Sequence, residues 1–330
     1  MVAEHPSPVF RLFLRLLSSN WAWGRLTLVL PDGTAHQLVG SRPGHAAVLN
    51  IRSYRFASRV LRGGDIGFAE GYMAGEWDSP DLAILLETLA NNYDHIRRLF
   101  DGNPLVNAFN WLGHKVNRNS RRGSRRNIPA HYDLGNAFYA SGLDETMTYS
   151  AARFERPGQS LAEAQQAKSA ALARQMDLRP GHSVLEIGCG WGGFAEFAAR
   201  EVGATVTGIT ISREQHDFAR RRLFEGYEER TDFIQKYVFP GGTLPSEEQL
   251  APVVSAAGLA WRNVERFGLD YSRTLSCWAR HFEAAWSGIR CVTPRFDERF
   301  RRLWLFYLAY CEAGFQSGRT DVIQLTLGRT

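Results

Sequence analysis

A glycine-rich stretch in the second half of the chain carries the clearest chemical signal of the sequence. Residues 183–200 read SVLEIGCGWGGFAEFAAR, in which an apolar strand over Val184–Ile187 precedes a turn over Gly188–Gly193 and a helix from Phe194. Glycines permit a tight turn and let a ligand approach bare backbone. The sequence therefore predicts a ligand-binding loop between a strand and a helix.

The glycine spacing fits two kinds of cofactor site. Gly188, Gly190 and Gly193 satisfy the G-x-G-x-x-G pattern of dinucleotide-binding proteins. The E-x-G-x-G-x-G pattern of class I methyltransferases is also present, formed by Glu186, Gly188, Gly190 and Gly192. The next expected strand, Ala204–Ile209, ends without the acidic residue that a nicotinamide enzyme places about 20 residues after the loop to bind the ribose. A methyltransferase site is therefore favoured, with a dinucleotide site as the alternative.

The first part of the chain predicts a smaller α+β domain over residues 1–113. Arg25–Leu30 and Thr34–Val39 alternate around Pro31-Asp32-Gly33, a pattern typical of a β-hairpin. Helical patterns follow over Tyr54–Leu61, Phe68–Met73 and Asp81–Asn91. Before the hairpin, Phe10–Leu17 carries an apolar helical stripe that is more typical of core packing than of membrane contact.

Charge is unevenly distributed along the chain. Residues 1–126 have 16 Lys and Arg against 10 Asp and Glu, whereas residues 127–330 have 23 against 24. The densest basic run, His114–Asn127, has one Lys, five Arg and no acidic residue. Such a run indicates either a solvated linker or a surface that attracts anionic lipid. Nucleic acid is not expected as a partner, because no zinc-finger, RNP or KH motif accompanies the charge.

The overall composition is that of a folded protein of two domains. The 330 residues are 44% hydrophobic and 22% charged, which excludes wholesale disorder. The four cysteines form no C-x-x-C pair, so neither a disulfide framework nor a zinc site is expected. No apolar run approaches the ~20 residues of a membrane-spanning helix. These features favour a cytoplasmic protein that can lie at the inner face of the membrane.

Several blocks along the chain together resemble the cyclopropane-fatty-acyl-phospholipid synthase family, whose members depend on S-adenosylmethionine (SAM). The blocks are GFAEGYMAGEW from Gly67, HYDLGNAF from His131, LDETMTYS from Leu143, the glycine loop, GITISREQ from Gly208, TDFIQKYVFPGGTLP from Thr231, Asp270-Tyr271 and the strand Asp321–Leu327. The fold implied is α/β: a class I SAM-dependent methyltransferase sheet of Rossmann-like type over residues 128–330, joined to the N-terminal domain by the basic linker 114–127.

The resemblance also implies a reaction and the residues that serve it. Methyl transfer from SAM to the cis double bond of an unsaturated phospholipid acyl chain is followed by proton removal by a bound bicarbonate ion and by ring closure. The resemblance assigns Tyr271 and the backbone of Ala151 to the bicarbonate site. The expected SAM-binding residues are Tyr149, Ser150, Glu186, Gly188, Cys189, Gly190, Gly192, Thr210, Ile211 and Gln215. A homodimer is compatible with the sequence.

The chain departs from the family pattern at one junction. After Arg222 it runs directly into Leu223–Tyr237, a segment that lies well downstream in the family. The stretch between them, on the order of 70 residues at ~30 per β-α unit, would carry the third to fifth strands of the sheet. It would also carry the Glu and His that complete the bicarbonate site. We therefore expect an incomplete sheet, with Val184–Ile187 lacking a neighbour on one side, and little or no synthase activity. A non-catalytic lipid-surface protein is the alternative function.

Overall fold

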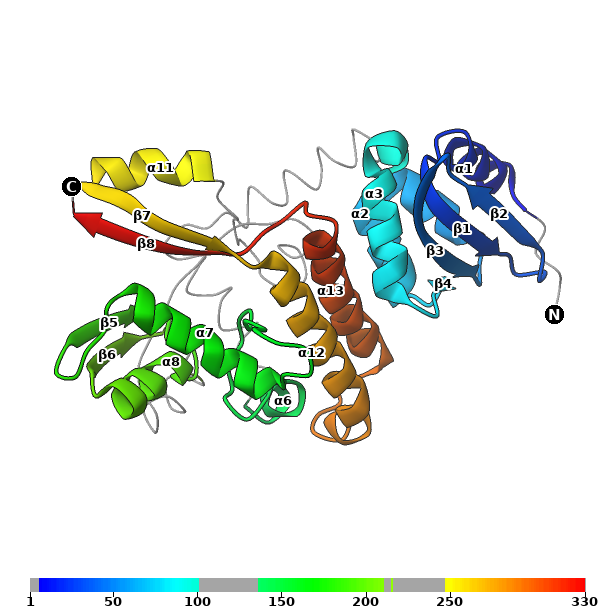
Figure 1. The fold of residues 1–330 in the computed structure, drawn as a ribbon. Coiled ribbons are helices and arrows are strands. Elements are labelled where there is room, and N and C mark those ends of the chain that lie inside the picture. The colour runs from blue at the N-terminus through cyan, green and yellow to red at the C-terminus, as the bar shows by residue number, and fades with distance from the viewer. Residues whose placement is uncertain (1–5, 101–135, 211–214, 216–246, 330) are drawn as a thin grey trace. The chain divides into compact units, whose positions relative to one another are not determined.

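The computed structural model of the chain describes residues 6–100, 136–210, 215 and 247–329 (Figure 1). Its helices are α1 (Pro8–Ser18), α2 (Arg55–Met73), α3 (Leu82–Phe100), α6 (Asn136–Gly142), α7 (Leu161–Gln175), α8 (Gly193–Phe197), a π-helical turn (Ala198–Val202), α11 (Glu247–Ala256), α12 (Gly268–Ile289) and α13 (Glu298–Gln316). Its strands are β1 (Trp23–Val29), β2 (Ala35–Val39), β3 (Arg42–Ile51), β4 (Trp77–Asp78), β5 (Ser183–Ile187), β6 (Thr205–Ile209), β7 (Leu259–Arg266) and β8 (Ile323–Arg329).

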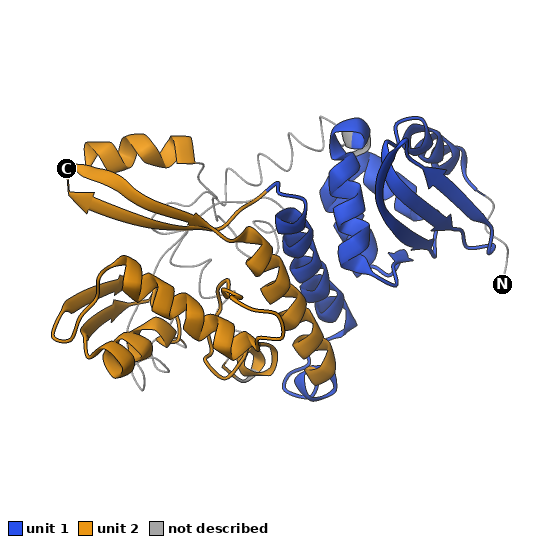
Figure 2. Ribbon diagram, in the orientation of Figure 1, with its two compact units in different colours: residues 1–116, 286–319 blue, residues 117–285, 320–330 orange. Residues whose placement is uncertain are grey.

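The chain divides into two compact units (Figure 2). Unit 1 comprises residues 1–116 and 286–319, and unit 2 comprises residues 117–285 and 320–330. The sequence analysis placed residues 286–319 in the methyltransferase domain, whereas the contacts assign them to unit 1. The reason is that α13 packs against α3 and α2.

Unit 1 is built on a four-stranded sheet in the order β2-β1-β3-β4. The predicted hairpin is confirmed: β1 and β2 pair antiparallel, with Leu28 opposite His36, and the amide of Leu30 donates to Thr34 across the turn. The interpretation of the N-terminal stripe as core packing is also confirmed, because Phe10 and Phe13 of α1 are buried.

The two helical patterns predicted at residues 54–61 and 68–73 lie on either side of a kink within α2, where Gly64 has a non-helical backbone. The helix continues through a kink at Gly64, whose φ of +60° lies in the region that glycine adopts at low cost. The sequence suggested a break because Gly63 and Gly64 interrupt the apolar period.

Helix α13 supplies a large part of the core of unit 1. The ring of Phe306 lies 5.7 Å from that of Tyr72 and 6.4 Å from that of Trp77. The guanidinium of Arg302 donates to the backbone oxygens of Tyr72 (2.6 Å) and Trp77 (2.9 Å) and pairs with Asp78 at 3.1 Å. This side chain is only 14% exposed, so it ties α13 to the end of α2 and to β4 through largely buried hydrogen bonds; Asp78 pairs in addition with Arg52 at 3.1 Å.

Unit 2 has two separate two-stranded sheets within the described residues. Strands β5 and β6 pair in parallel, and β7 and β8 pair antiparallel with α11 against β7 (Figure 1). This incomplete sheet agrees with the expectation from the sequence. The side chains of Leu185 and Ile187 on β5 are 61% and 69% exposed. One face of this strand is therefore open to solvent, whereas parallel strands are normally covered on both faces.

None of the helices in the described ranges combines the length and the apolar composition that crossing a bilayer requires.

Candidate functional site

The glycine loop forms at the carboxyl ends of the paired strands β5 and β6. The backbone amides of Gly188 and Cys189 both donate to the carbonyl oxygen of Ile209, the last residue of β6, at 2.7 and 3.2 Å. Gly188, Gly190 and Gly192 have φ of +82°, +53° and +83°. Residues other than glycine rarely adopt such backbone angles, so the geometry of the turn explains why glycine recurs at every second position.

The backbone of this loop is open to a ligand at two of its glycines. A Cβ atom built on Gly188 or on Gly190 would meet no other heavy atom within 4 Å. At Gly193, by contrast, it would lie 2.6 Å from the hydroxyl oxygen of Thr148, so this glycine permits close packing instead. The backbone at Gly188 and Gly190 is therefore accessible to a ligand such as SAM.

A cluster of aromatic side chains lies beside the glycine loop. Trp191 is buried, donates from Nε1 to Asn136 at 2.7 Å and lies 4.8 Å from the ring of Tyr139. Tyr149 lies 5.2 Å from the same ring and stacks on Trp278 at 4.9 Å. The structure thus brings the predicted residue Tyr149 beside the loop, as part of an apolar wall.

Helix α7 holds the segment that contains Tyr149 and Ser150. Its start is fixed by a capping box in which Ser160 and Glu163 bond each other's backbone amides. One turn further on, Gln165 donates from Nε2 to the backbone oxygens of Thr148 (3.1 Å) and Ser150 (2.8 Å). The backbone of this wall is therefore positioned by a buried amide.

Two further predicted cofactor residues are joined by a buried hydrogen bond. The hydroxyl of Thr210, directly after β6, donates to Oε1 of Gln215 at 2.6 Å. Ile211 lies outside the described residues. Glu186 is half-buried on β5, two residues before the loop begins, and Cys189 is buried within it.

The two residues predicted for the bicarbonate site also lie near each other in the fold. The backbone amide of Ala152 donates to the hydroxyl of Thr274 at 3.0 Å, which places buried Ala151 against the first turns of α12. Tyr271 lies one turn earlier on the same helix, and its ring meets the ring of Trp278 edge-on at 6.0 Å. Because Trp278 also stacks on Tyr149, the aromatic cluster connects both predicted sites.

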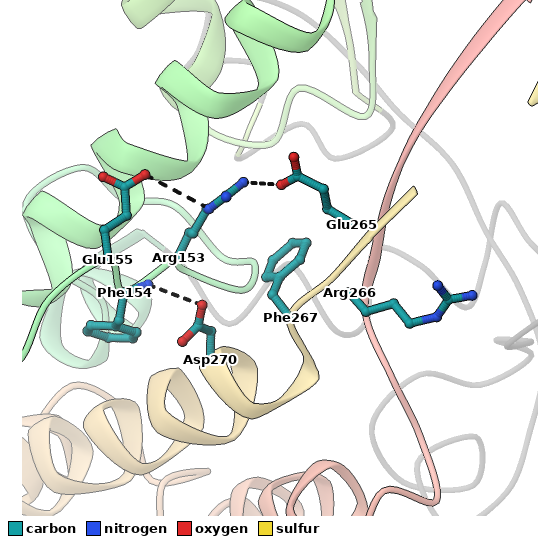
Figure 3. Close-up of a pocket in the computed structure, with 7 residues that line it drawn as sticks. All are labelled: Arg153, Phe154, Glu155, Glu265, Arg266, Phe267 and Asp270. Atoms are coloured by element: carbon teal, nitrogen blue, oxygen red, sulfur yellow. Dashed lines mark hydrogen bonds and ion pairs between the residues drawn. The ribbon is translucent and has the colours of Figure 1, made fainter. Parts of the chain in front are cut away.

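A polar pocket of about 460 Å³ lies beside this region (Figure 3). Arg153 pairs with Glu265 and Glu155 there, whereas Arg266 extends away from the others (Figure 3). Asp270 accepts from the amide of Phe154 at 3.2 Å, and burial raises the pKa of this carboxyl. The lining residues are Arg153, Phe154, Glu155, Glu265, Arg266, Phe267 and Asp270.

Sequence reasoning did not predict this pocket. Its residues come from a loop, a strand end and a helix start that are distant in the sequence, and their charges follow no motif. The one available signal was the placement of Asp270 directly before the predicted Tyr271.

The fold and the loop define a class I SAM-dependent methyltransferase. The sequence profile of the mycolic acid cyclopropane synthetase family matches residues 119–231 and again residues 224–325. Tuberculostearic acid methyltransferase UfaA1 of Mycobacterium tuberculosis is 33% identical, over 96% of this chain and 90% of its own length. Cyclopropane-fatty-acyl-phospholipid synthase of Escherichia coli is 28% identical, over 93% of this chain and 94% of its own length. The chain therefore belongs to the cyclopropane synthase family of methyltransferases.

Solved structures agree with this assignment. The mycolic acid cyclopropane synthase CmaA1, complexed with SAH and CTAB, is 25% identical and matches with a TM-score of 0.56. The match covers 62% of this chain and 97% of that one. Coclaurine N-methyltransferase, bound to N-methylheliamine and SAH, shares the fold with a TM-score of 0.59 at 15% identity.

The comparisons also mark the junction that the sequence analysis singled out. The alignment to UfaA1 spans 396 positions, yet 96% of this chain is fewer than 330 residues, so roughly 80 positions have no counterpart here. The two profile matches meet at residues 224–231, directly after Arg222. The break between the two profile matches is consistent with a missing family segment at this point.

Proposed function

We propose that this chain binds SAM at the glycine loop and directs its methyl carbon to the cis double bond of an unsaturated phospholipid acyl chain. The observation that carries the proposal is the open backbone at Gly188 and Gly190, next to the wall formed by Tyr149. SAM supplies an electrophilic methyl group on its sulfonium. The family membership and the names of the relatives support an unsaturated acyl chain as the acceptor.

The described residues would serve this reaction by binding SAM and by excluding water from the site. Alkene carbon is a weak nucleophile, so the rate depends on proximity and on a dry site. Trp191, Tyr149 and Trp278 supply apolar walls, while the hydrogen-bonded pair Thr210 and Gln215 follows β6 and is expected to contact SAM.

Bicarbonate fits the chain only in part. Of the groups that the resemblance implies for this ion, the chain keeps Tyr271 and the backbone of Ala151, without the Glu and His expected from the missing segment.

Turnover of this chain should be far below that of a full-length relative. Loss of one well-placed proton-transfer or electrostatic group costs ~10²–10⁴ in rate, and groups that act as a unit fail together. The assay incubates the purified chain with labelled SAM and vesicles of unsaturated phospholipid, then analyses the acyl chains. Incorporation above the no-enzyme control but at least ~100-fold slower than in the relative is expected. Turnover equal to the relative's would contradict the role given to the missing segment.

An anionic membrane surface is the proposed partner of unit 1. On α1, Val9 and Leu12 are 40% and 49% exposed, and Arg11 and Arg15 are exposed with no acidic residue in the helix. Such a face combines apolar contact with attraction to anionic lipid. The basic run 114–127, which points the same way by composition, lies outside the described residues.

A non-catalytic lipid-surface protein is the second candidate, favoured by the roughly 80 missing positions. Calorimetric titration with SAM separates the two candidates. Saturable binding supports the cofactor-using enzyme, and no heat at millimolar SAM with intact vesicle binding supports the second candidate.

A further inference from the structure

Lys168 is a side chain beside the cofactor region to which the proposed function gives no role. The chain has 39 Lys and Arg residues, of which three are lysines, and Lys168 is the only lysine within the described ranges. Lysine differs from arginine in its compact ammonium group and in a pKa that burial readily shifts. In a chain that almost always uses arginine as its cation, a half-buried lysine at this point of α7 calls for a chemical reason.

The hydrogen bonds around Lys168 have a fixed direction. Its Nζ donates to Oγ of Ser150 at 2.6 Å and to Oε1 of Gln165 at 2.7 Å. The amide nitrogen of Gln165 donates in turn to the backbone oxygens of Ser150 and Thr148. All three of these bonds between α7 and the 148–150 segment therefore run from a donor on α7 to an acceptor on that segment.

This direction determines what the hydroxyl of Ser150 can do. An ammonium group has donors and no acceptor, so Oγ of Ser150 must accept from it. The proton of the same hydroxyl is then available to another acceptor. Ser150 is exposed, and its segment packs against the glycine loop through the close approach of Thr148 to Gly193.

We propose that the ammonium group of Lys168 is a positioning element of the cofactor site, which turns the hydroxyl proton of Ser150 outward to donate to the carboxylate of SAM. The inference rests on the proposed function, since it requires SAM at the glycine loop. A neutral amine at the same place could accept from Ser150, and the hydroxyl would then turn inward and lose its bond to the cofactor.

The charge state of Lys168 is therefore the variable that matters. Burial lowers the pKa of Lys168 to about 8, against the opposing effect of two carboxylates, those of Asp144 and Glu186. These are the charged groups that face it, Asp144 from the segment before residue 148 and Glu186 from β5. The ammonium form dominates at pH 7, and the neutral amine dominates at pH 9.5.

The test compares SAM affinity by calorimetry at pH 7.0 and 9.5 for the wild type, Lys168→Met and Gln166→Met. Gln166 is exposed on the same helix and serves as the matched control. A hydrogen bond to a charged group typically changes affinity by about tenfold or more. We expect Lys168→Met to bind SAM about tenfold or more weakly than the wild type at pH 7.0, and within about twofold of it at pH 9.5. Comparison at equal pH removes the titration of SAM itself.

The controls keep each result decisive. Gln166→Met should match the wild type at both pH values, and melting without SAM shows whether each variant is folded. Should Lys168→Met not fold, Lys168→Gln replaces it with the same expectation. Equal affinities of the wild type and the variant at pH 7.0 would overturn the inference, as would a difference that persists unchanged at pH 9.5, because packing alone does not titrate. A wild type that fails to bind SAM would overturn the proposed function and this inference with it.

Discussion

The glycine loop allows a prediction in which strain and cofactor contact are separated by a matched pair of variants. Gly188 has φ of +82° and open space around a built Cβ. Gly181, before the other end of the same strand β5, has φ of +81° and the same open space. Alanine at either position therefore meets the same backbone penalty, about 1–2 kcal/mol for a left-handed residue. The two variants differ in whether the added methyl stands where SAM is proposed to bind.

The expected outcome is equal loss of stability and unequal loss of affinity. Gly188→Ala should weaken SAM binding by about 100-fold, equivalent to ~2.7 kcal/mol at 1.4 kcal/mol per tenfold change, because the methyl group occupies the approach to bare backbone. Gly181→Ala should bind SAM within about threefold of the wild type. Five strand residues at ~3.3 Å each separate the two glycines, which places the control well away from the ligand.

Calorimetric titration gives the affinities, and thermal melting without SAM gives the stabilities. Both melting temperatures should fall by similar amounts. The reasoning is refuted if Gly188→Ala and Gly181→Ala bind SAM equally well, since the loop backbone would then not be the surface that the cofactor approaches.

Three further predictions concern charge. The pKa of Lys168 is about 8 in the fold and 10.5 in the unfolded chain, so the unfolded chain holds the extra proton between these values. The free energy of unfolding of the wild type, relative to that of Lys168→Met, should therefore rise by about 2–3 kcal/mol from pH 8 to 10.5, after allowance for partial exposure. A difference in unfolding free energy that does not change with pH would contradict this. Replacing Arg302 by Met should destabilise unit 1 by about 2 kcal/mol by melting, because the backbone oxygens of Tyr72 and Trp77 each lose a donor and Asp78 keeps only its pair with Arg52. Arg301→Met, which removes an i,i+3 pair with Glu298, should cost under ~1 kcal/mol. Neutralising the four arginines of the pairs 121–122 and 125–126 should weaken binding to anionic vesicles by ~1 kcal/mol per charge in a sedimentation assay, and insensitivity to both the substitutions and salt would leave the run as a linker.

Local patterns were sufficient to predict most of the elements near the site. The strand over Val184–Ile187 and the turn after it follow from short-range patterning and glycine placement, and the structure confirms both. What short-range patterns cannot specify is the partner of a buried face. The aromatic residues of Phe296–Tyr310 repeat at helical spacing, but nothing in that spacing indicates that the helix packs against α2 and α3.

The chemistry of the site was predictable where a motif carries it and missed where contacts carry it. The glycine loop could be predicted because its tight turn requires glycine at regularly spaced positions of the sequence. Lys168 was missed because the role proposed for it depends on a hydrogen bond to Ser150, 18 residues earlier, and no sequence motif marks that contact. The scarcity of lysine in the chain was the one signal that could have marked it.

Helix α13 has a consequence for how this protein can be divided in the laboratory. Unit 1 is formed by two stretches of chain that lie more than 150 residues apart in the sequence, and Trp304, Phe306 and Tyr307 of α13 are buried in the fold. An N-terminal fragment that stops at the basic run would leave Tyr72 and Trp77 without the ring of Phe306 and the donors of Arg302. A self-sufficient fragment must therefore carry residues 286–319 on a spliced linker, and exchange of this unit between relatives requires three crossovers in the gene instead of one.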